Sequence, residues 1–124
     1  MDKTAAVDGL SALAHEGRLE IFRLLVRAGP GGVAAGEIAR QTGSLANTLS
    51  TNLAILSRAG LVASRRDGRS IIYAAAYGRM GALLAFLLED CCCGNSAICA
   101  PLAAITAQAA CCAAEEAISQ GAPA

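Results

Sequence analysis

The 124-residue chain has few aromatic side chains and little charge. It has no tryptophan, an aromatic content of 3% and 16% charged residues, compared with about 25% charged residues in an average globular domain. This composition excludes charge-driven disorder of the whole chain, and the 55% of apolar types can form a core. Because 29 residues are alanine, the composition favours helices over sheets, in one domain or one domain with a tail.

The chain also lacks the marks of an exported or membrane protein. Residues 1–4 are not a basic segment followed by an apolar run, so no secretory signal is visible. Proline and polar residues interrupt the uncharged stretch 97–114, which argues against a membrane span. We therefore expect a cytoplasmic protein that does not bind membranes and whose six cysteines are reduced thiols.

The net charge of zero hides an uneven distribution. Residues 17–79 hold nine arginines and three acidic residues, a net charge of +6, whereas residues 1–16 carry −2 and residues 80–124 carry −4. A local excess of arginine can bind phosphate even when the whole protein is neutral. The middle of the chain is therefore a candidate nucleic-acid contact.

Apolar spacing and turn residues predict a mainly α-helical fold with a small β-hairpin. A last, alanine-rich helix is expected from Pro101 to about Ile118. Asp67-Gly68 is a hairpin turn signal between two short β-rich runs. The other predicted helices span residues 8–27 with a break near His15 and Gly17, residues 34–41, residues 45–58 and residues 81–92.

The predicted helix 45–58 has two unlike faces, with Ser44 as its expected N-cap and Gly60 as its end. Small uncharged polar residues fit close approach to a polar partner such as a DNA groove, although a bland solvent-facing surface is the alternative. The apolar stripe is Leu45, Leu49, Leu53 and Leu56, and the other side carries Asn47, Thr48, Ser50 and Thr51 with Ala54 and Arg58.

Two further segments indicate surfaces for partners. Arg65, Arg66 and Arg69 surround the hairpin turn, where they can meet phosphate or, alternatively, only protect a sheet edge from pairing. The helix 81–92 is apolar on most sides, and a partner subunit is its expected cover.

Three segments resemble the ArsR-type repressors, the metalloid- and metal-sensing winged helix-turn-helix family. The opening LSALAHEGRLEIFRLL at 10–25, the helix NTLSTNLAILSRAGLV at 47–62 and the wing RRDGRSIIY at 65–73 carry the resemblance, which covers about residues 8–90. It implies a homodimer joined by the first and fifth helices, which binds a palindromic double-stranded operator and is released by an inducer. It also implies a regulator, not an enzyme.

The resemblance assigns roles by position. Residues 1–90 would form the DNA-binding and dimerisation domain, and residues 91–124 a cysteine-rich sensor segment. Arg65, Arg66 and Arg69 would meet the DNA backbone or minor groove. His15 stands where the family often has Asp, and we interpret it as a helix-junction residue. The major groove would be faced by Asn47, Thr48, Ser50, Thr51 and Asn52.

Two sensor sites common in the family are absent from the sequence. The helix before the recognition helix, residues 37–42, lacks the Cys-x-Cys pair of the best-known members. The Asp and His site of the fifth helix is excluded because no histidine follows His15.

The cysteines at 91–93 and Cys99 are the candidate sensor instead. Three thiolates without imidazole suit As(III) or Sb(III), which take three sulfurs, whereas Zn(II) prefers four ligands. The spacing resembles a subgroup of arsenic-responsive repressors. We expect Cys92, Cys93 and Cys99 to bind, with Cys91 in place of Cys93 as the alternative and no organic cofactor. Cys111 and Cys112 are a possible auxiliary site, and simple buried thiols are the bland alternative.

Other functions leave different signatures. A redox or sulfane-sulfur sensor of the same fold would oxidise two cysteines instead of binding an ion. An arsenate reductase of the common kind needs an arginine six residues after its cysteine, and no arginine follows Arg79. A metallochaperone would not need the arginine-bearing hairpin.

Overall fold

The computed structural model describes residues 1–89. The chain divides into two units, Met1–Phe86 and Leu87–Ala124, and the fold described here is that of the first unit together with the end of its last helix. The predictions for the cysteines, for the end of the helix 81–92 and for the helix from Pro101 lie outside the described residues.

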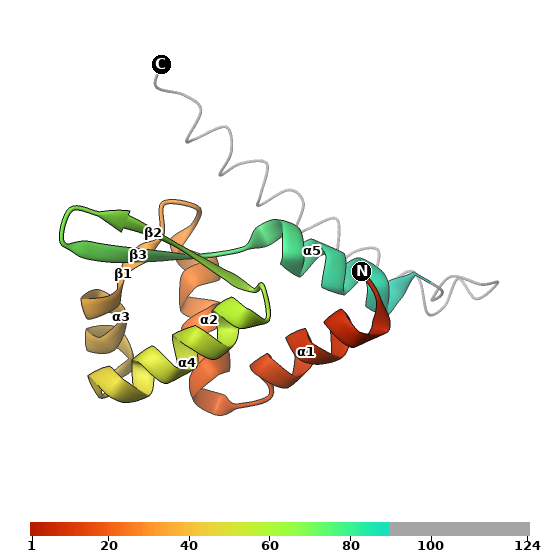
Figure 1. The fold of residues 1–124 in the computed structure, drawn as a ribbon, viewed down its shortest axis with the longest axis horizontal. Helices are drawn as coiled ribbons and strands as arrows, with labels where there is room; N and C mark the ends of the chain where they lie inside the picture. The colour runs from red at the N-terminus through yellow and green to blue at the C-terminus, as the bar shows by residue number, and fades with distance from the viewer. Residues whose placement is uncertain (90–124) are drawn as a thin grey trace, which may run out of the picture. The chain divides into compact units, whose positions relative to one another are not determined.

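The first unit is mainly helical with a small antiparallel sheet, as predicted (Figure 1). Its fold is a winged helix-turn-helix, in which α3 and α4 form the helix-turn-helix and the hairpin forms the wing. The elements, in order, are α1 (Lys3–Leu13), α2 (Glu16–Ala28), β1 (Val33–Ala34), α3 (Ala35–Thr42), α4 (Ala46–Arg58), β2 (Val62–Asp67), β3 (Ser70–Ala75) and α5 (Tyr77–Leu88).

The predicted break in the first helix is confirmed between α1 and α2. His15 is the N-cap of α2, and its Nδ1 accepts hydrogen bonds from the backbone N–H groups of Gly17 at 3.1 Å and Arg18 at 3.4 Å. The Arg18 Nε donates to the Ala12 carbonyl at 2.6 Å, which satisfies an acceptor near the end of α1. His15 is therefore the helix-junction residue that the sequence indicated.

Two helices begin earlier than predicted because capping and tertiary contacts extend them. α1 begins at Lys3, since the Asp2 carboxylate accepts from the Ala5 N–H at 2.7 Å as an N-cap. α5 begins at Tyr77 and not at residue 81, and the Tyr77 hydroxyl donates to the Val26 carbonyl of α2 at 3.0 Å. This bond ties the start of α5 to the end of α2.

The sheet has three strands in the order β1-β3-β2, all antiparallel. β1 has only two residues, paired with Tyr73 and Ile72 of β3, and it was not predicted because two residues show no periodicity. Asp67 pairs with Ser70, so the two turn residues are Gly68 and Arg69, one position later than predicted. Gly68 supplies a positive φ of 63° at the first turn position.

The core lies where α2, α3 and α4 meet the base of the sheet. Its fully buried large side chains include Leu25 from α2, Ile38 from α3 and Leu56 from α4. The α4 helix ends in a Schellman motif, in which Gly60 at φ 80° donates to the Ser57 carbonyl and the Leu61 N–H donates to the Leu56 carbonyl. This end of α4 agrees with the sequence.

The start of α4 differs from the prediction. The N-cap is Leu45, whose side chain accepts no hydrogen bond, and the Ser44 hydroxyl instead shares a hydrogen bond of 2.8 Å with the Thr42 hydroxyl. Leu49, Leu53 and Leu56 are buried as predicted, but Leu45 is 72% exposed. The leucine stripe therefore loses its first member because the chain is extended at Leu45, before the helix begins.

No helix within residues 1–89 is long and apolar enough to cross a bilayer.

The loop between α2 and β1 provides a test of this packing. Gly32 has φ 78°, and a Cβ there would lie 2.7 Å from the Tyr73 carbonyl oxygen, whereas a Cβ on Gly31 would meet nothing within 4 Å. We expect Gly32→Ala to lower the free energy of unfolding by about 2 kcal/mol or more, measured by urea denaturation. Gly31→Ala is the matched control and should cost far less; equal losses would contradict this packing.

Candidate nucleic-acid interface

The turn between α3 and α4 is short and held by local hydrogen bonds. Gly43 ends α3 in the left-handed conformation at φ 70°, and Ser44 and Leu45 lead into α4. The Thr42 hydroxyl donates to the Ile38 carbonyl at 2.8 Å, which holds the last turn of α3. Because Ile38 and the leucines of α4 share one core, the two helices keep a fixed crossing.

The outer face of α4 presents the polar side chains that the sequence indicated. Asn47, Thr48, Ser50 and Thr51 are all exposed. The Thr51 hydroxyl donates to the Asn47 carbonyl at 3.0 Å, and the Asn47 side-chain oxygen accepts from the Thr48 N–H at 3.2 Å. The face is neutral and its side chains are short, so a polar surface can come close to the helix backbone.

Asn52 does not belong to this exposed face, and its assignment to the major groove is wrong for this structure. Its side chain is 6% exposed. A Cβ on Gly17 would lie 3.4 Å from the Asn52 Nδ2 and 3.3 Å from the His15 Cε1, so Asn52 packs at the junction of α1 and α2. It lies three residues after Leu49 and four before Leu56, which places it on the buried side of the helix.

The three wing arginines have different surroundings. The Arg65 guanidinium donates to the Gly31 carbonyl at 3.0 Å, which ties β2 to the loop before β1. Arg66 and Arg69 are exposed, and neither guanidinium has a hydrogen bond or an ion pair with the rest of residues 1–89. The hairpin therefore carries two guanidinium groups, those of Arg66 and Arg69, that have no partner within residues 1–89. The third, that of Arg65, also holds β2 against the loop before β1.

The charges of α3 largely cancel each other. Glu37 pairs with Arg40, whose Nε donates to the Glu37 Oε2 at 2.8 Å, and Gln41 donates to Oε1 at 2.9 Å. The hydrogen bond from Arg40, and next that from Gln41, lowers the pKa of Glu37 to about 2. Glu37 is therefore ionised at neutral pH, and the uncompensated positive charge on this side comes from the wing.

The hairpin tip and the start of α4 lie toward the same side of the unit in Figure 1, whereas α1 and α5 lie on the opposite side. A Cβ on Gly9 of α1 would lie 3.6 Å from the Leu83 Cδ2 of α5, so the two helices are in contact. Both carry exposed apolar side chains, namely Val7, Leu10, Leu84 and Leu87. The unit thus has one side with the polar side chains of α4 and the arginines of the wing, and another where exposed apolar side chains of α1 and α5 lie.

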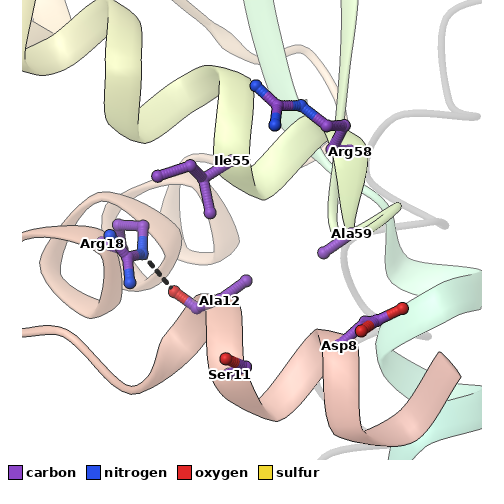
Figure 2. A pocket seen from close by; sticks show the side chains of 7 residues that line it. All are labelled: Asp8, Ser11, Ala12, Arg18, Ile55, Arg58 and Ala59. Atoms are coloured by element: carbon purple, nitrogen blue, oxygen red, sulfur yellow. Dashed lines mark hydrogen bonds between the residues drawn. The ribbon is translucent and has the colours of Figure 1, made fainter. Parts of the chain in front are cut away.

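A cavity of about 330 Å³ lies between α1, the start of α2 and the end of α4 (Figure 2). Asp8 on α1 and Arg58 on α4 line facing sides, and the bond from Arg18 to the Ala12 carbonyl crosses one edge. The lining contains no histidine or cysteine that could activate a nucleophile, so it lacks a familiar catalytic arrangement. The other lining residues are Ser11, Ile55 and Ala59.

The predicted metalloid ligands cannot be placed, since all six cysteines lie outside the described residues. Within residues 1–89, no three side chains of the metal-ligating types come together. The assignments to Cys91, Cys92, Cys93, Cys99, Cys111 and Cys112 remain predictions.

Comparison with known proteins agrees with this fold. A family model described as a helix-turn-helix domain matches residues 13–65. The chain is 36% identical over 83 residues to the HTH-type transcriptional regulator YgaV of Escherichia coli, covering 67% of this chain and 82% of that protein.

Two solved structures are similar as well. One is the solution structure of the homodimeric winged helix-turn-helix DNA-binding domain of Mb0332 from Mycobacterium bovis, a possible ArsR-family transcriptional regulator. It is 33% identical, has a TM-score of 0.56, and the match covers 70% of this chain and 81% of that one. The other is a possible transcriptional regulator for arsenical resistance, 27% identical with a TM-score of 0.58, covering 66% of this chain and 82% of that one.

Proposed function

This chain belongs to the ArsR-type family of winged helix-turn-helix transcriptional regulators, and from that premise we propose that it is a metalloid-responsive repressor. In this proposal a homodimer binds a palindromic operator and is released when As(III) or Sb(III) binds the C-terminal cysteines. As a transcriptional regulator it is not an enzyme.

The observation that carries the DNA part of the proposal is the placement of two complementary surfaces on one side of the unit. The small polar side chains of α4 suit a major groove, because they leave room for the helix and offer hydrogen bonds to base edges. Arg66 and Arg69 at the hairpin suit the phosphates beside that groove. In winged helix proteins the recognition helix and the wing act together in this way.

The wing predicts a measurable salt dependence. Each phosphate contact releases counterions, so losing Arg69 in both subunits should lower operator affinity and reduce the slope of log K against log salt by about 2. We would measure Arg69→Ala by fluorescence anisotropy over a range of salt concentrations. Arg27→Ala is the control, because Arg27 lies in a groove between α2 and α5 on the other side. An unchanged slope for Arg69→Ala would contradict the assigned role of the wing.

The apolar side formed by α1 and α5 supports the homodimer. Exposed leucines and valine on two helices in contact form a surface that water disfavours and that a second copy can cover. The homodimeric Mb0332 domain is consistent with such an assembly. A dimer would also place two recognition helices for the two halves of a palindrome.

A charge placed on this surface tests the dimer. Leu84→Glu should bury an unpaired carboxylate in the interface and give monomers or aggregates, as measured by sedimentation. Ile71→Glu is the matched control, because Ile71 is similarly exposed but lies on β3 of the hairpin. If Leu84→Glu remains dimeric, α5 is not the interface.

The induction part of the proposal is supported by the cysteine chemistry of the sequence. Cys92, Cys93 and Cys99 supply three soft ligands, which match the trigonal preference of As(III) and Sb(III). The similarity to a possible regulator for arsenical resistance points in the same direction. The cysteines follow α5 in the sequence, so a bound ion can bias the dimer helix toward a geometry that fits the operator poorly.

The energetic requirement for release is modest. The ion must weaken operator binding by the same factor that the operator weakens ion binding. A tenfold loss of operator affinity needs a coupling free energy of only ~1.4 kcal/mol. Thiols lose their protons when they bind, so ion binding also releases protons.

Serine substitution tests which cysteines bind the metalloid ion. Cys99→Ser should keep operator binding but abolish release by arsenite, because only two thiolates remain; Cys111→Ser should have a smaller effect. Operator release is followed by anisotropy with reduced protein. Normal release of Cys99→Ser, together with loss in the Cys111→Ser, Cys112→Ser double variant, would show that we chose the wrong cysteines. Release by an oxidant or polysulfide, but not by arsenite, would identify a redox or sulfane-sulfur sensor instead.

A further inference from the structure

Leu45 breaks two local rules at one position. Its side chain is 72% exposed, the highest exposure among the large apolar residues of the described chain. It is also the N-cap of α4, a position where Ser, Thr, Asp or Asn is preferred because their side chains accept a backbone hydrogen bond. Such departures from local preference are expected at functional sites.

The other exposed leucines have an explanation that Leu45 lacks. Leu10, Leu84 and Leu87 lie on α1 and α5, on the apolar side assigned to the dimer, and Leu19 of α2 lines a groove together with Leu84. Leu45 lies at the start of α4, next to the exposed polar side chains Asn47, Thr48, Ser50 and Thr51. The start of α4 lies toward the same side of the unit as the hairpin tip (Figure 1). Its extended backbone, with φ −71° and ψ 150°, sets it outside the helix and its buried stripe.

We propose that Leu45 is a specificity-determining residue that contacts the 5-methyl group of a thymine in each operator half-site. This inference rests on the proposed function, since it requires that α4 enters the major groove. The residues at the start of a recognition helix are the ones that reach base edges. Leu45 precedes the polar face that begins at Asn47, so it lies at this reading end.

The chemistry of the base edges selects thymine. In the major groove, thymine alone among the four bases presents a methyl group, and the groups that distinguish the other three bases are hydrogen-bond donors and acceptors. A leucine over a donor or acceptor would remove water without replacing its hydrogen bond, which is unfavourable. A leucine over a methyl group buries apolar surface on both partners.

Uracil removes the methyl group and leaves the pairing edge of thymine unchanged, so it is the sharpest probe. We would replace each operator thymine by uracil in turn and measure dissociation constants by anisotropy. For the unmodified protein, uracil at the contacted position of one half-site should weaken binding about fourfold. Uracil at that position in both half-sites together should weaken binding about fifteenfold. Uracil at the remaining thymine positions is the control and should have little effect.

Variants of Leu45 then assign the effect. Leu45→Ala should bind the thymine and uracil operators equally, whereas Leu45→Met, which keeps an apolar side chain of similar size, should retain the discrimination. Thr48→Ala is the control, because a threonine methyl can also contact thymine. If Thr48→Ala removes the discrimination and Leu45→Ala does not, the assignment to Leu45 is wrong.

Leu45→Ser separates binding from stability. Serine is a good N-cap, so this variant should raise the melting temperature of the free protein while it loses the preference for thymine over uracil. Opposite changes in stability and discrimination cannot come from a damaged fold. Discrimination that survives in Leu45→Ser would overturn the inference.

The outcomes distinguish a failure of the proposed function from a failure of the role proposed for Leu45. If the unmodified protein binds no operator fragment, the proposed function fails and this inference fails with it. If it binds with the expected salt dependence but the uracil scan shows no sensitive position, the proposed function stands and the role of Leu45 is overturned.

Discussion

The burial of Leu49, Leu53 and Leu56 against α2 and α3 sets the rotation of α4 about its own axis, and the rest of the interface depends on that rotation. Successive residues in a helix are 100° apart, so a shift by one position would turn the polar side chains toward the core. Asn52 strengthens the constraint, because its buried amide lies close to Gly17 and His15. The exposed polar face is therefore a consequence of core packing.

The arginines near this interface differ in their partners within residues 1–89. Arg40 forms an ion pair with Glu37, which offsets its charge, whereas Arg65 donates to the neutral Gly31 carbonyl and keeps its charge. Arg66 and Arg69 keep their charge for an outside partner. The sequence count of nine arginines thus overstates the positive charge available to DNA.

Repeating patterns in the sequence predicted the elements that many residues determine together. They did not predict the features of the fold that a single contact determines. The α4 helix, the hairpin and the break at His15 follow from repeating patterns or strong turn signals, and all three are present. β1 arises from pairing with β3, which no two-residue pattern reveals. Asn52 looked like its polar neighbours, and Leu45 looked like the other leucines, because composition does not show where a helix begins or which polar group the core accepts.

The hydrogen bond from the Tyr77 hydroxyl to the Val26 carbonyl attaches the start of α5 to the end of α2 and leaves the far end of α5 without this attachment. This bond holds the first residue of α5 at the end of α2, so a displacement of the far end of the helix would turn about that residue. Twelve residues of helix are about 18 Å long, and a rotation of about 5° moves the far end by about 1.6 Å. Such a rotation would act on α2 at Val26, and α2 packs directly against α4.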